Sequence, residues 1–413
     1  MSRKTIAALV VVVILIVGVS AWYILMQQAP ARSSIKVGHI VSLSGSVASA
    51  GVRVKVIADA VVKDINDKGG VYLKDYGRSL PIELIEVDDE SNPTKAVEFA
   101  TKLITDNNVD VIVCLSYAFI SVPALKVAEQ YEVPAIAGTP IEFFASGGPW
   151  KTSWGYFFSY NKIMNGFIEW MSEYRGETNQ KVAVILSDDI VGRTQHSMLI
   201  PKLENANYEI FDLGLYPPDT TDFTSIVVKL KEEKCDILWV HGVPPIFAAF
   251  WRQCQQLGYK PKVVFQSGGA SRLDDIQILG GDLPLGLITH LDWHTSYPYP
   301  HCDFIGQLMQ NTLKESGMDL SWESGYWASA WYILEDALKR AGTLDKKAIN
   351  TAIGETDMTG PCGPIKFNKE THVGTGMQSL GQWMKTAEGK WSMEPIWSEV
   401  PQVPTVTPIF PLP

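Results

Sequence analysis

The sequence lacks the motifs by which several enzyme classes are recognised. It contains no GxGxxG, no GxxxxGK[ST], no HExxH and no GxSxG, which are the patterns of dinucleotide sites, phosphate loops, zinc helices and serine nucleophiles. No catalytic residue and no cofactor are therefore expected. An anchored extracellular enzyme stays open only as an alternative class.

Cysteine is scarce, and its five positions form no CxxC pair, which argues against a structural zinc site. Cys114 and Cys235 fall in apolar runs that are typical of buried free thiols. Cys302 and Cys362 lie in loop-like segments. These two either stay free or pair with each other, and their spacing does not decide between the alternatives.

Clustered positive charge and metal-ligand spacing are also missing. The formal net charge is −10, and no long basic run follows residue 5, so no nucleic-acid partner is expected. His290 and His294 are four residues apart, but Pro298 and Pro300 make their surroundings a loop with no helical face to align ligands. No metal site is therefore expected there.

What the chain does have is a long uncharged run near its start. Residues 6–26 carry no charge over 21 positions and follow a positive head that contains Arg3 and Lys4. Such a run is long enough to span a bilayer, and the basic head places the remainder outside. Two interpretations of residues 1–34 stay open: an uncleaved membrane anchor with a linker, or a secretion signal cleaved near the small residues Val19 to Ala21.

Beyond residue 35, short apolar runs alternate with helical patterns, which predicts βαβ units and parallel sheets in an α/β fold. There are too many units for one compact sheet. Breaks near 150–160 and 290–300 indicate two lobes. Residues 396–413 are rich in proline, and we expect this tail to be extended and unpacked.

Small, hydroxylic and polar residues follow the predicted strands in both halves of the chain. Ligands of open parallel sheets bind beyond the carboxyl ends of the strands. The alternative is that these residues only cap helices, but their repetition over several loops favours a binding cleft. The candidates found in this way are Ser44, Ser46, Ser116, Thr139, Asp189, His241 and Ser267. Trp293, in a proline-rich loop, is a further candidate, with core packing as its alternative role.

Three segments carry a resemblance to a known family. They are the opening unit at 35–70, the Asp-Asp segment at 87–96 and the TGPCGPIKF segment at 359–367. Over about residues 35–395 the chain resembles the type I periplasmic binding proteins of the leucine/isoleucine/valine-binding class. Members of this class bind branched-chain amino acids or amides. These are the substrate-binding proteins of ABC transporters.

The resemblance implies two doubly wound parallel-sheet lobes joined by a hinge of three crossovers. Lobe 1 would comprise 35–158 and 288–360, and lobe 2 would comprise 159–287 and 361–395. The implied protein is an extracytoplasmic monomer that captures a small solute by hinge closure and delivers it to an ABC permease. The alternative is a ligand-sensing receptor ectodomain that works through a partner protein.

The resemblance also implies site residues. In amino-acid-binding members the loops after the third and fourth strands grip the ligand, and their positions here are Tyr117, Ala118, Thr139 and Ile141, beside Ser116. The other lobe normally adds two tyrosines and a glutamate.

In this chain those three positions hold Val191, Val243 and Ser267, and an aromatic position of the first loop holds Ala50. A buried ammonium group without a carboxylate costs several kcal/mol. A neutral amide, a carboxylate without an amine, or an aromatic solute therefore fits better than an amino acid. The minority alternative is that Asp188 or Asp189 replaces the glutamate.

Overall fold

The computed structural model describes residues 32–413. The expected membrane segment at 6–26, with its alternative as a cleaved signal, lies outside the described residues. Within 32–413, none of the helices has the length and apolar character needed to cross a membrane.

The first lobe is built on a six-stranded sheet in the order β15-β7-β6-β5-β1-β4, in which every pairing is parallel. Its central strand β5 reads Val-Ile-Val-Cys and is buried along its whole length, as expected for a parallel strand covered by helices on both faces. The strands are β1 (Ile35–Val41), β4 (Ile82–Asp88), β5 (Val111–Cys114), β6 (Ala135–Ala137), β7 (Ser153–Tyr156) and β15 (Val373–Gly374). The helices of this lobe are α2 (Ala48–Asp67), α3 (Pro93–Thr105), α4 (Ala118–Gln130), α5 (Ile141–Gly147), α12 (Ser324–Ala341) and α13 (Lys346–Gly354).

The second lobe holds a seven-stranded sheet in the order β17-β16-β12-β11-β10-β8-β9. Its first five strands in the chain are parallel, and β16 and β17 add an antiparallel edge. The strands are β8 (Lys181–Ser187), β9 (Glu209–Tyr216), β10 (Ile237–His241), β11 (Val263–Ser267), β12 (Ile288–Leu291), β16 (Ser379–Lys385) and β17 (Trp391–Ser398). The helices are α6 (Tyr160–Glu173), α7 (Ile190–Asn205), α8 (Thr224–Glu233), α9 (Pro244–Gln256) and α10 (Leu273–Leu279).

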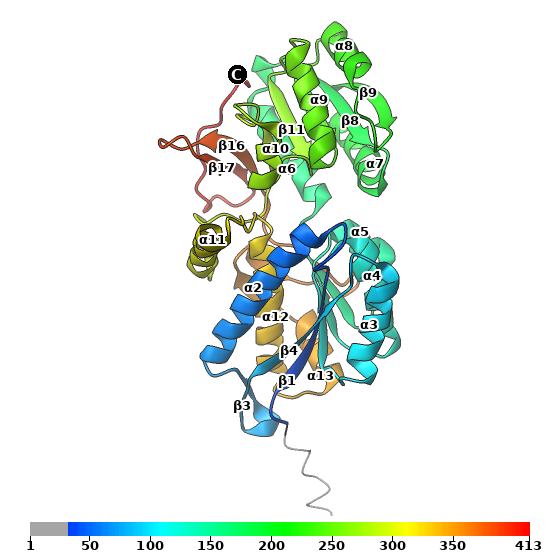
Figure 1. The fold of residues 1–413 in the computed structure, drawn as a ribbon, viewed down its shortest axis with the longest axis vertical. Coiled ribbons are helices and arrows are strands. Elements are labelled where there is room, and N and C mark those ends of the chain that lie inside the picture. Colours follow the sequence, from blue (N-terminus) through cyan, green and yellow to red (C-terminus); the bar gives the residue numbers. More distant parts are fainter. Residues whose placement is uncertain (1–31) are drawn as a thin grey trace, which may run out of the picture.

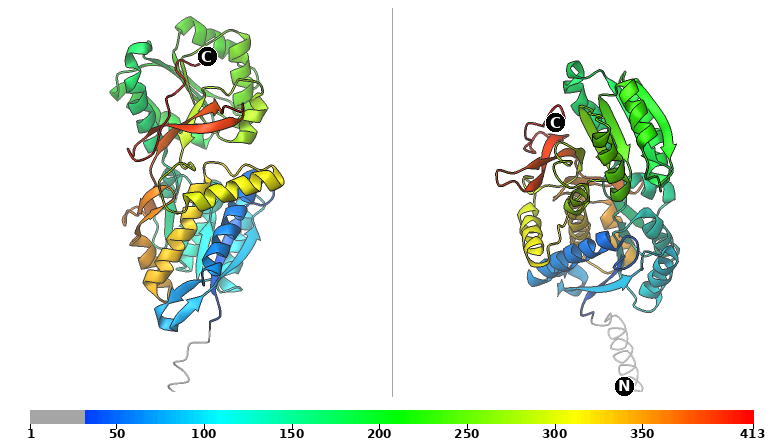
Figure 2. Two further views of the ribbon diagram at one scale, coloured as in Figure 1. Left: turned by 90° about the vertical axis from the view of Figure 1, so that its left-hand side faces the viewer. Right: turned by 45° about the horizontal axis from the view of Figure 1, so that its top comes forward.

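Smaller elements complete the described chain. They are the hairpin β2 (Val71–Leu73) and β3 (Arg78–Leu80), the hairpin β13 (Asp357–Gly360) and β14 (Gly363–Lys366), the helix α11 (Cys302–Ser316) and the 3-10 turns η1 (Lys74–Tyr76) and η2 (Arg175–Glu177). Figures 1 and 2 show the two lobes stacked along the long axis, with α11 near their junction. The predicted α/β fold with two parallel-sheet lobes is confirmed.

The chain passes between the two sheets three times, after β7, after β12 and after β15. Two of these passages differ from the predicted boundaries at 288 and 360. Ile288 of β12 pairs with Phe265 of β11 in the second sheet, and Val373 of β15 pairs with Gly155 in the first sheet. Each of these passages therefore lies further along the chain than predicted, because strand pairing, rather than the nearest Gly- or Pro-rich break, decides which sheet a segment joins.

The proline-rich tail is packed, and the prediction that it is unpacked is wrong. Residues 396–398 complete β17. Further on, the ring of Phe410 lies 4.4 Å from that of Tyr174, and the Leu412 N–H donates to the Lys262 carbonyl at 2.8 Å. Proline supplies no N–H for a strand ladder, but the residues between the prolines still bond to the second lobe.

All five cysteines are buried free thiols. Cys302 is the first residue of α11, and its Sγ accepts a hydrogen bond from Trp293 Nε1 at 3.2 Å. Cys362 lies in the turn between β13 and β14. The sequence left open whether Cys302 and Cys362 form a disulfide, and in the structure both are free thiols.

Candidate functional site

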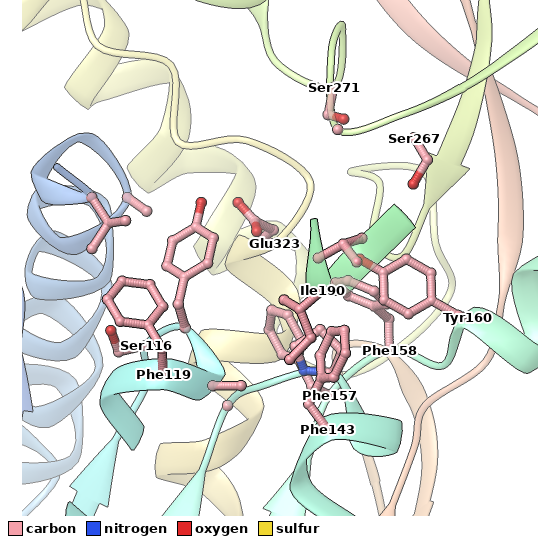
Figure 3. A pocket seen from close by; sticks show the side chains of 18 of the residues that line it. Ser116, Phe119, Phe143, Phe157, Phe158, Tyr160, Ile190, Ser267, Ser271 and Glu323 are labelled. Atoms are coloured by element: carbon pink, nitrogen blue, oxygen red, sulfur yellow. The ribbon is translucent and has the colours of Figure 1, made fainter. Parts of the chain in front are cut away.

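A cavity of about 580 Å³ lies between the lobes. Its wall comes from the loops that follow β1, β5 and β6 in the first lobe and β8, β10 and β11 in the second, together with the start of α12. These loops share the carboxyl ends of the parallel strands, the place where ligands of open α/β sheets bind. Figure 3 shows how side chains from both lobes converge on this space.

The structure brings most of the predicted site residues to this cavity. Those that line it in the first lobe are Ser116, Tyr117 and Ala118, and those in the second lobe are Asp189, Val191, His241, Val243 and Ser267. Ala50, where the resemblance implies an aromatic residue, also lines it.

Ser44 and Ser46 do not line the cavity. Both are exposed, and the Ser44 hydroxyl donates to Asp88 Oδ2 at 2.8 Å. Asp88 also accepts the Leu43 N–H at 2.8 Å. Although partial burial opposes it, the bonds to Glu90, Ser44 and Leu43 lower the pKa of Asp88. The Ser-rich loop is thus folded onto a carboxylate of its own lobe.

Three further predicted residues stay off the cavity wall. Thr139 is fully buried, while its neighbours Gly138 and Pro140 face the cavity. Ile141 begins α5 and is half-buried. Trp293 is 2% exposed, and a Cβ added to Gly325 would lie 2.4 Å from its ring. Trp293 therefore has the packing role that was its alternative.

The cavity wall contains eight aromatic side chains, of which the sequence analysis predicted only Tyr117. They are Tyr117, Phe119, Phe143, Phe157, Phe158, Tyr160, Trp322 and Trp327. Phe157 and Phe158 lie on the first passage between lobes, and Figure 3 shows them beside Phe143 and Tyr160. The sequence signal for Phe157 and Phe158 is that they form an aromatic run directly after the strand β7. Such a wall suits an apolar, flat group, since aromatic rings pack well face to edge and offset.

Asp189 caps a helix and also lines the cavity. Its Oδ1 accepts the Gly192 N–H at 2.8 Å at the start of α7, and its Oδ2 lies 3.4 Å from His241 Nε2. Burial acts to raise the pKa of Asp189, but the hydrogen bond and charge of His241 and the Gly192 N–H outweigh it and hold that pKa at about 2. Asp188 is exposed and pairs with Arg193 at 2.6 Å.

Ser267, where the resemblance implies a glutamate in amino-acid-binding members, belongs to a neutral hydrogen-bond chain. Gln195 Nε2 donates to Ser267 Oγ at 2.9 Å, and Gln195 Oε1 accepts from Trp239 Nε1 at 2.9 Å. The Ser267 carbonyl lies 2.6 Å from His241 Nδ1. This part of the wall therefore offers hydroxyl and imidazole groups and no carboxylate at 267.

An ion pair that the sequence analysis missed spans the cleft. Arg272 precedes α10 in the second lobe, and Glu323 precedes α12 in the first. Arg272 Nη2 lies 2.7 Å from Glu323 Oε2, and the side chains are 17% and 12% exposed. Burial opposes the charge of Arg272, but Glu323 and other neighbours raise its pKa above the ordinary value. Both residues line the cavity, and only the fold brings them together.

His290 belongs to a hydrogen-bond network that connects the cavity with two of the passages between the lobes. It lines the cavity, its Nδ1 lies 3.2 Å from Asp292 Oδ2, and Gln378 Nε2 donates to Asp292 Oδ1 at 2.6 Å. Burial raises the pKa of Asp292 even though His290 and Gln378 favour its ionised form. This network ties the segment after β12 to the segment before β16. Among residues 32–413 there is no cluster of potential metal ligands.

With two α/β lobes, three passages and a cleft at the strand ends, the fold and site define a hinged binding protein. The periplasmic binding protein family matches residues 34–388. Across 401 residues, the Leu/Ile/Val-binding protein homolog 1 of Brucella abortus is 22% identical, which covers 94% of this chain and 99% of the relative.

Solved structures agree on the fold. A branched-chain amino acid transporter substrate binding protein from Streptococcus pneumoniae, in complex with isoleucine, matches with a TM-score of 0.72 and 18% identity, covering 88% of this chain and 99% of the other. A solute binding protein of an ABC transporter from Rhodopseudomonas palustris BisB5, in complex with 3,4-dihydroxy benzoic acid, matches with a TM-score of 0.72 and 21% identity, covering 91% and 99%.

The chain belongs to the periplasmic binding protein family, and the resemblance seen in its sequence is confirmed. Its fold is that of the type I periplasmic binding proteins. Members of the family are substrate-binding proteins, not enzymes, that bind small solutes and work with ABC permeases. Of the proteins named above, the two with solved structures are described as transporter binding proteins, and none is described as a sensing receptor.

Proposed function

We propose that this protein captures a small solute between its lobes on the extracytoplasmic side of the membrane and delivers it to an ABC permease. It acts as a monomer without a cofactor and without catalysis. Residues 1–34 either anchor it or are removed on secretion. The observation that carries the proposal is the cavity of about 580 Å³, which is formed by the strand-end loops of both lobes.

The wall of this cavity favours a solute with an apolar, preferably aromatic, body and a carboxylate or amide group. Aromatic side chains from both lobes and from the passage between them supply the apolar contact. Ser116 lies at the start of α4, where the N–H groups of the first helical turn have no intrahelical acceptor and attract an anion or a carbonyl oxygen. With Ser267 in place of a glutamate, no carboxylate at that position is available for an ammonium group.

The test is thermal unfolding of the full-length chain in mild detergent, followed by its intrinsic tryptophan fluorescence. The panel contains aromatic acids, aromatic and aliphatic amides, small carboxylates and branched amino acids. A solute at about 100 times its Kd adds about 2.7 kcal/mol to the free energy of unfolding and raises Tm by several degrees. We expect the largest rise with aromatic acids or amides. An unchanged Tm with every member of the panel would contradict the proposal.

A further inference from the structure

The ion pair between Arg272 and Glu323 differs from ordinary surface pairs in its location. It forms part of the cavity wall and connects the two lobes. Arg272 Nη2 and Nε both contact the same oxygen of Glu323, Oε2, at 2.7 and 3.3 Å. Ser321 Oγ also donates to this oxygen, at 3.3 Å. The pair sets one positive and one negative charge against each other in the cleft, and the buried Asp275 is a further acidic group close to Arg272.

The pair still leaves polar atoms for a solute. Among the described residues, neither Arg272 Nη1 nor Glu323 Oε1 has a hydrogen bond to a side chain or to the backbone. Ser271, the neighbour of Arg272, lines the cavity, is 5% exposed, and its hydroxyl has no partner in the same part of the chain. A buried hydroxyl without a partner costs free energy that a bound solute would recover. Ser271 adjoins Arg272 in the chain, and Arg272 pairs with Glu323, so these donors and this acceptor belong to one part of the cavity wall.

A balanced pair discriminates by charge. A second anion or cation placed beside it would be left without a counter-charge in a partly desolvated site, which is unfavourable. A neutral amide group carries one acceptor oxygen and two N–H donors, which match the arginine and serine donors and the glutamate acceptor. We propose that Arg272, Glu323 and Ser271 form a specificity site that selects a neutral amide-like group on the solute and rejects a charged group there. This inference rests on the proposed function.

A second ion pair across the lobes provides the matched control. Arg53 on α2 pairs with Asp274 on α10, and neither residue lines the cavity. Removing the charge of Asp274 therefore weakens a lobe contact of the same kind but leaves the cavity wall as it is. It should alter the affinity for all solutes by one common factor.

The experiment measures the Kd of three probes that share a ring and a carboxylate and differ in the para group: 4-carbamoylbenzoate, terephthalate and 4-(aminomethyl)benzoate. The full-length chain, E323Q, R272Q and D274N are titrated calorimetrically, with circular dichroism as the check on folding. We expect the wild type to prefer the carbamoyl probe. E323Q leaves Arg272 without its ion-pair partner. In this variant the affinity for terephthalate, relative to that for the carbamoyl probe, should rise about tenfold.

R272Q should shift the preference towards the aminomethyl probe by a similar factor, so either variant tests the inference if the other does not fold. D274N should leave the ratios of the three Kd values unchanged. Selectivity that is the same in wild type, E323Q and R272Q overturns the inference, as does a wild type that binds other members of the broad panel but none of these probes. A wild type that binds nothing in either panel overturns the proposed function with it.

Discussion

At the level of single residues, one large side chain of the cavity wall, that of Tyr117, is exposed and contributes little to the packing of the fold. Tyr117 lines the cavity and is 44% exposed, so its truncation removes solute contact and leaves little void. We predict that Tyr117→Ala weakens the best solute of the panel about tenfold, since the loss of partly buried ring area costs about 1–2 kcal/mol. Calorimetric titration measures the loss.

Tyr131 is the matched control for that variant. It is 43% exposed, lies just after α4 and does not line the cavity. Tyr131→Ala should retain the wild-type Kd, and both variants should unfold near the wild-type Tm. Equal affinities for the two variants would mean that the solute does not contact the Tyr117 side of the cleft.

Asp189 gives a prediction on pH. Its pKa in the folded protein is about 2, below the unfolded value of about 3.9, so its ionised form stabilises the fold above about pH 4 and this contribution is lost as the pH falls through about 2. With the side chain 32% exposed, solvent screening limits the effect to about 1 kcal/mol. Urea unfolding of Asp189→Asn should show a weaker loss of stability between pH 4 and pH 2 than the wild type.

The neighbouring carboxylate separates this effect from a general loss of charge. Asp188 is exposed, and within residues 32–413 its ion-pair partner is Arg193; exposed pairs contribute little. Asp188→Asn should therefore follow the wild-type pH curve. If the Asp189→Asn curve also follows it, the contact with His241 does not stabilise the protein.

Residue-level features of the site were only partly predictable. The polar residues after the strands gave seven candidates, of which Ser116, Asp189, His241 and Ser267 line the cavity. The family resemblance gave four more that line it: Tyr117, Ala118, Val191 and Val243. The sequence could not tell that Thr139 turns away while Gly138 and Pro140 face the cavity, because side-chain direction in a loop depends on backbone angles that no periodicity encodes. It also could not pair Arg272 with Glu323, 51 positions apart.

At the level of elements, the alternation of apolar runs with helical patterns predicted the βαβ units from which both sheets are built. The start of α3 shows such a local signal, because Asn92 caps the helix and accepts the Thr94 N–H at 2.9 Å. The tail was the main failure. Its composition indicated an unpacked segment, but hydrogen bonds to the second lobe depend on partners such as Gln382 and Lys262 that are distant in sequence.

The packed tail leads to a prediction on stability. Deleting residues 404–413 removes the contact between Phe410 and Tyr174 and the bonds between Ile409 and Gln382. We expect a loss of about 2–3 kcal/mol, since burying one aromatic side chain contributes about 1.5–3 kcal/mol. Phe410→Ala should account for about half of it in urea unfolding. A deletion variant with the wild-type midpoint would show that the tail packs without stabilising the lobe.

At the level of the whole molecule, the two-lobe architecture followed from the number of βαβ units, whereas the lobe boundaries did not. The short strand β15 joins the first sheet by pairing with β7, and β12 holds the antiparallel edge of the second sheet through β16. Two residues of strand are too short for a periodic signal, and a pairing choice between lobes depends on which neighbour is free in space. Chain breaks therefore marked the hinge region without fixing its residues.

Capture of the solute between the lobes requires the lobes to approach each other, which a distance measurement across the cleft detects. Glu98 on α3 and Lys229 on α8 are exposed and lie on different lobes (Figure 1). Cysteines introduced there can be labelled selectively, because burial raises the pKa of all five native thiols and the thiolate is the reactive form.

Single-molecule fluorescence transfer between donor and acceptor dyes on E98C and K229C then reports the separation of the lobes. We expect the best solute of the panel to shift the population to a shorter distance, with a midpoint at the calorimetric Kd and one solute per chain. Binding at that Kd with an unchanged lobe separation would contradict capture by closure.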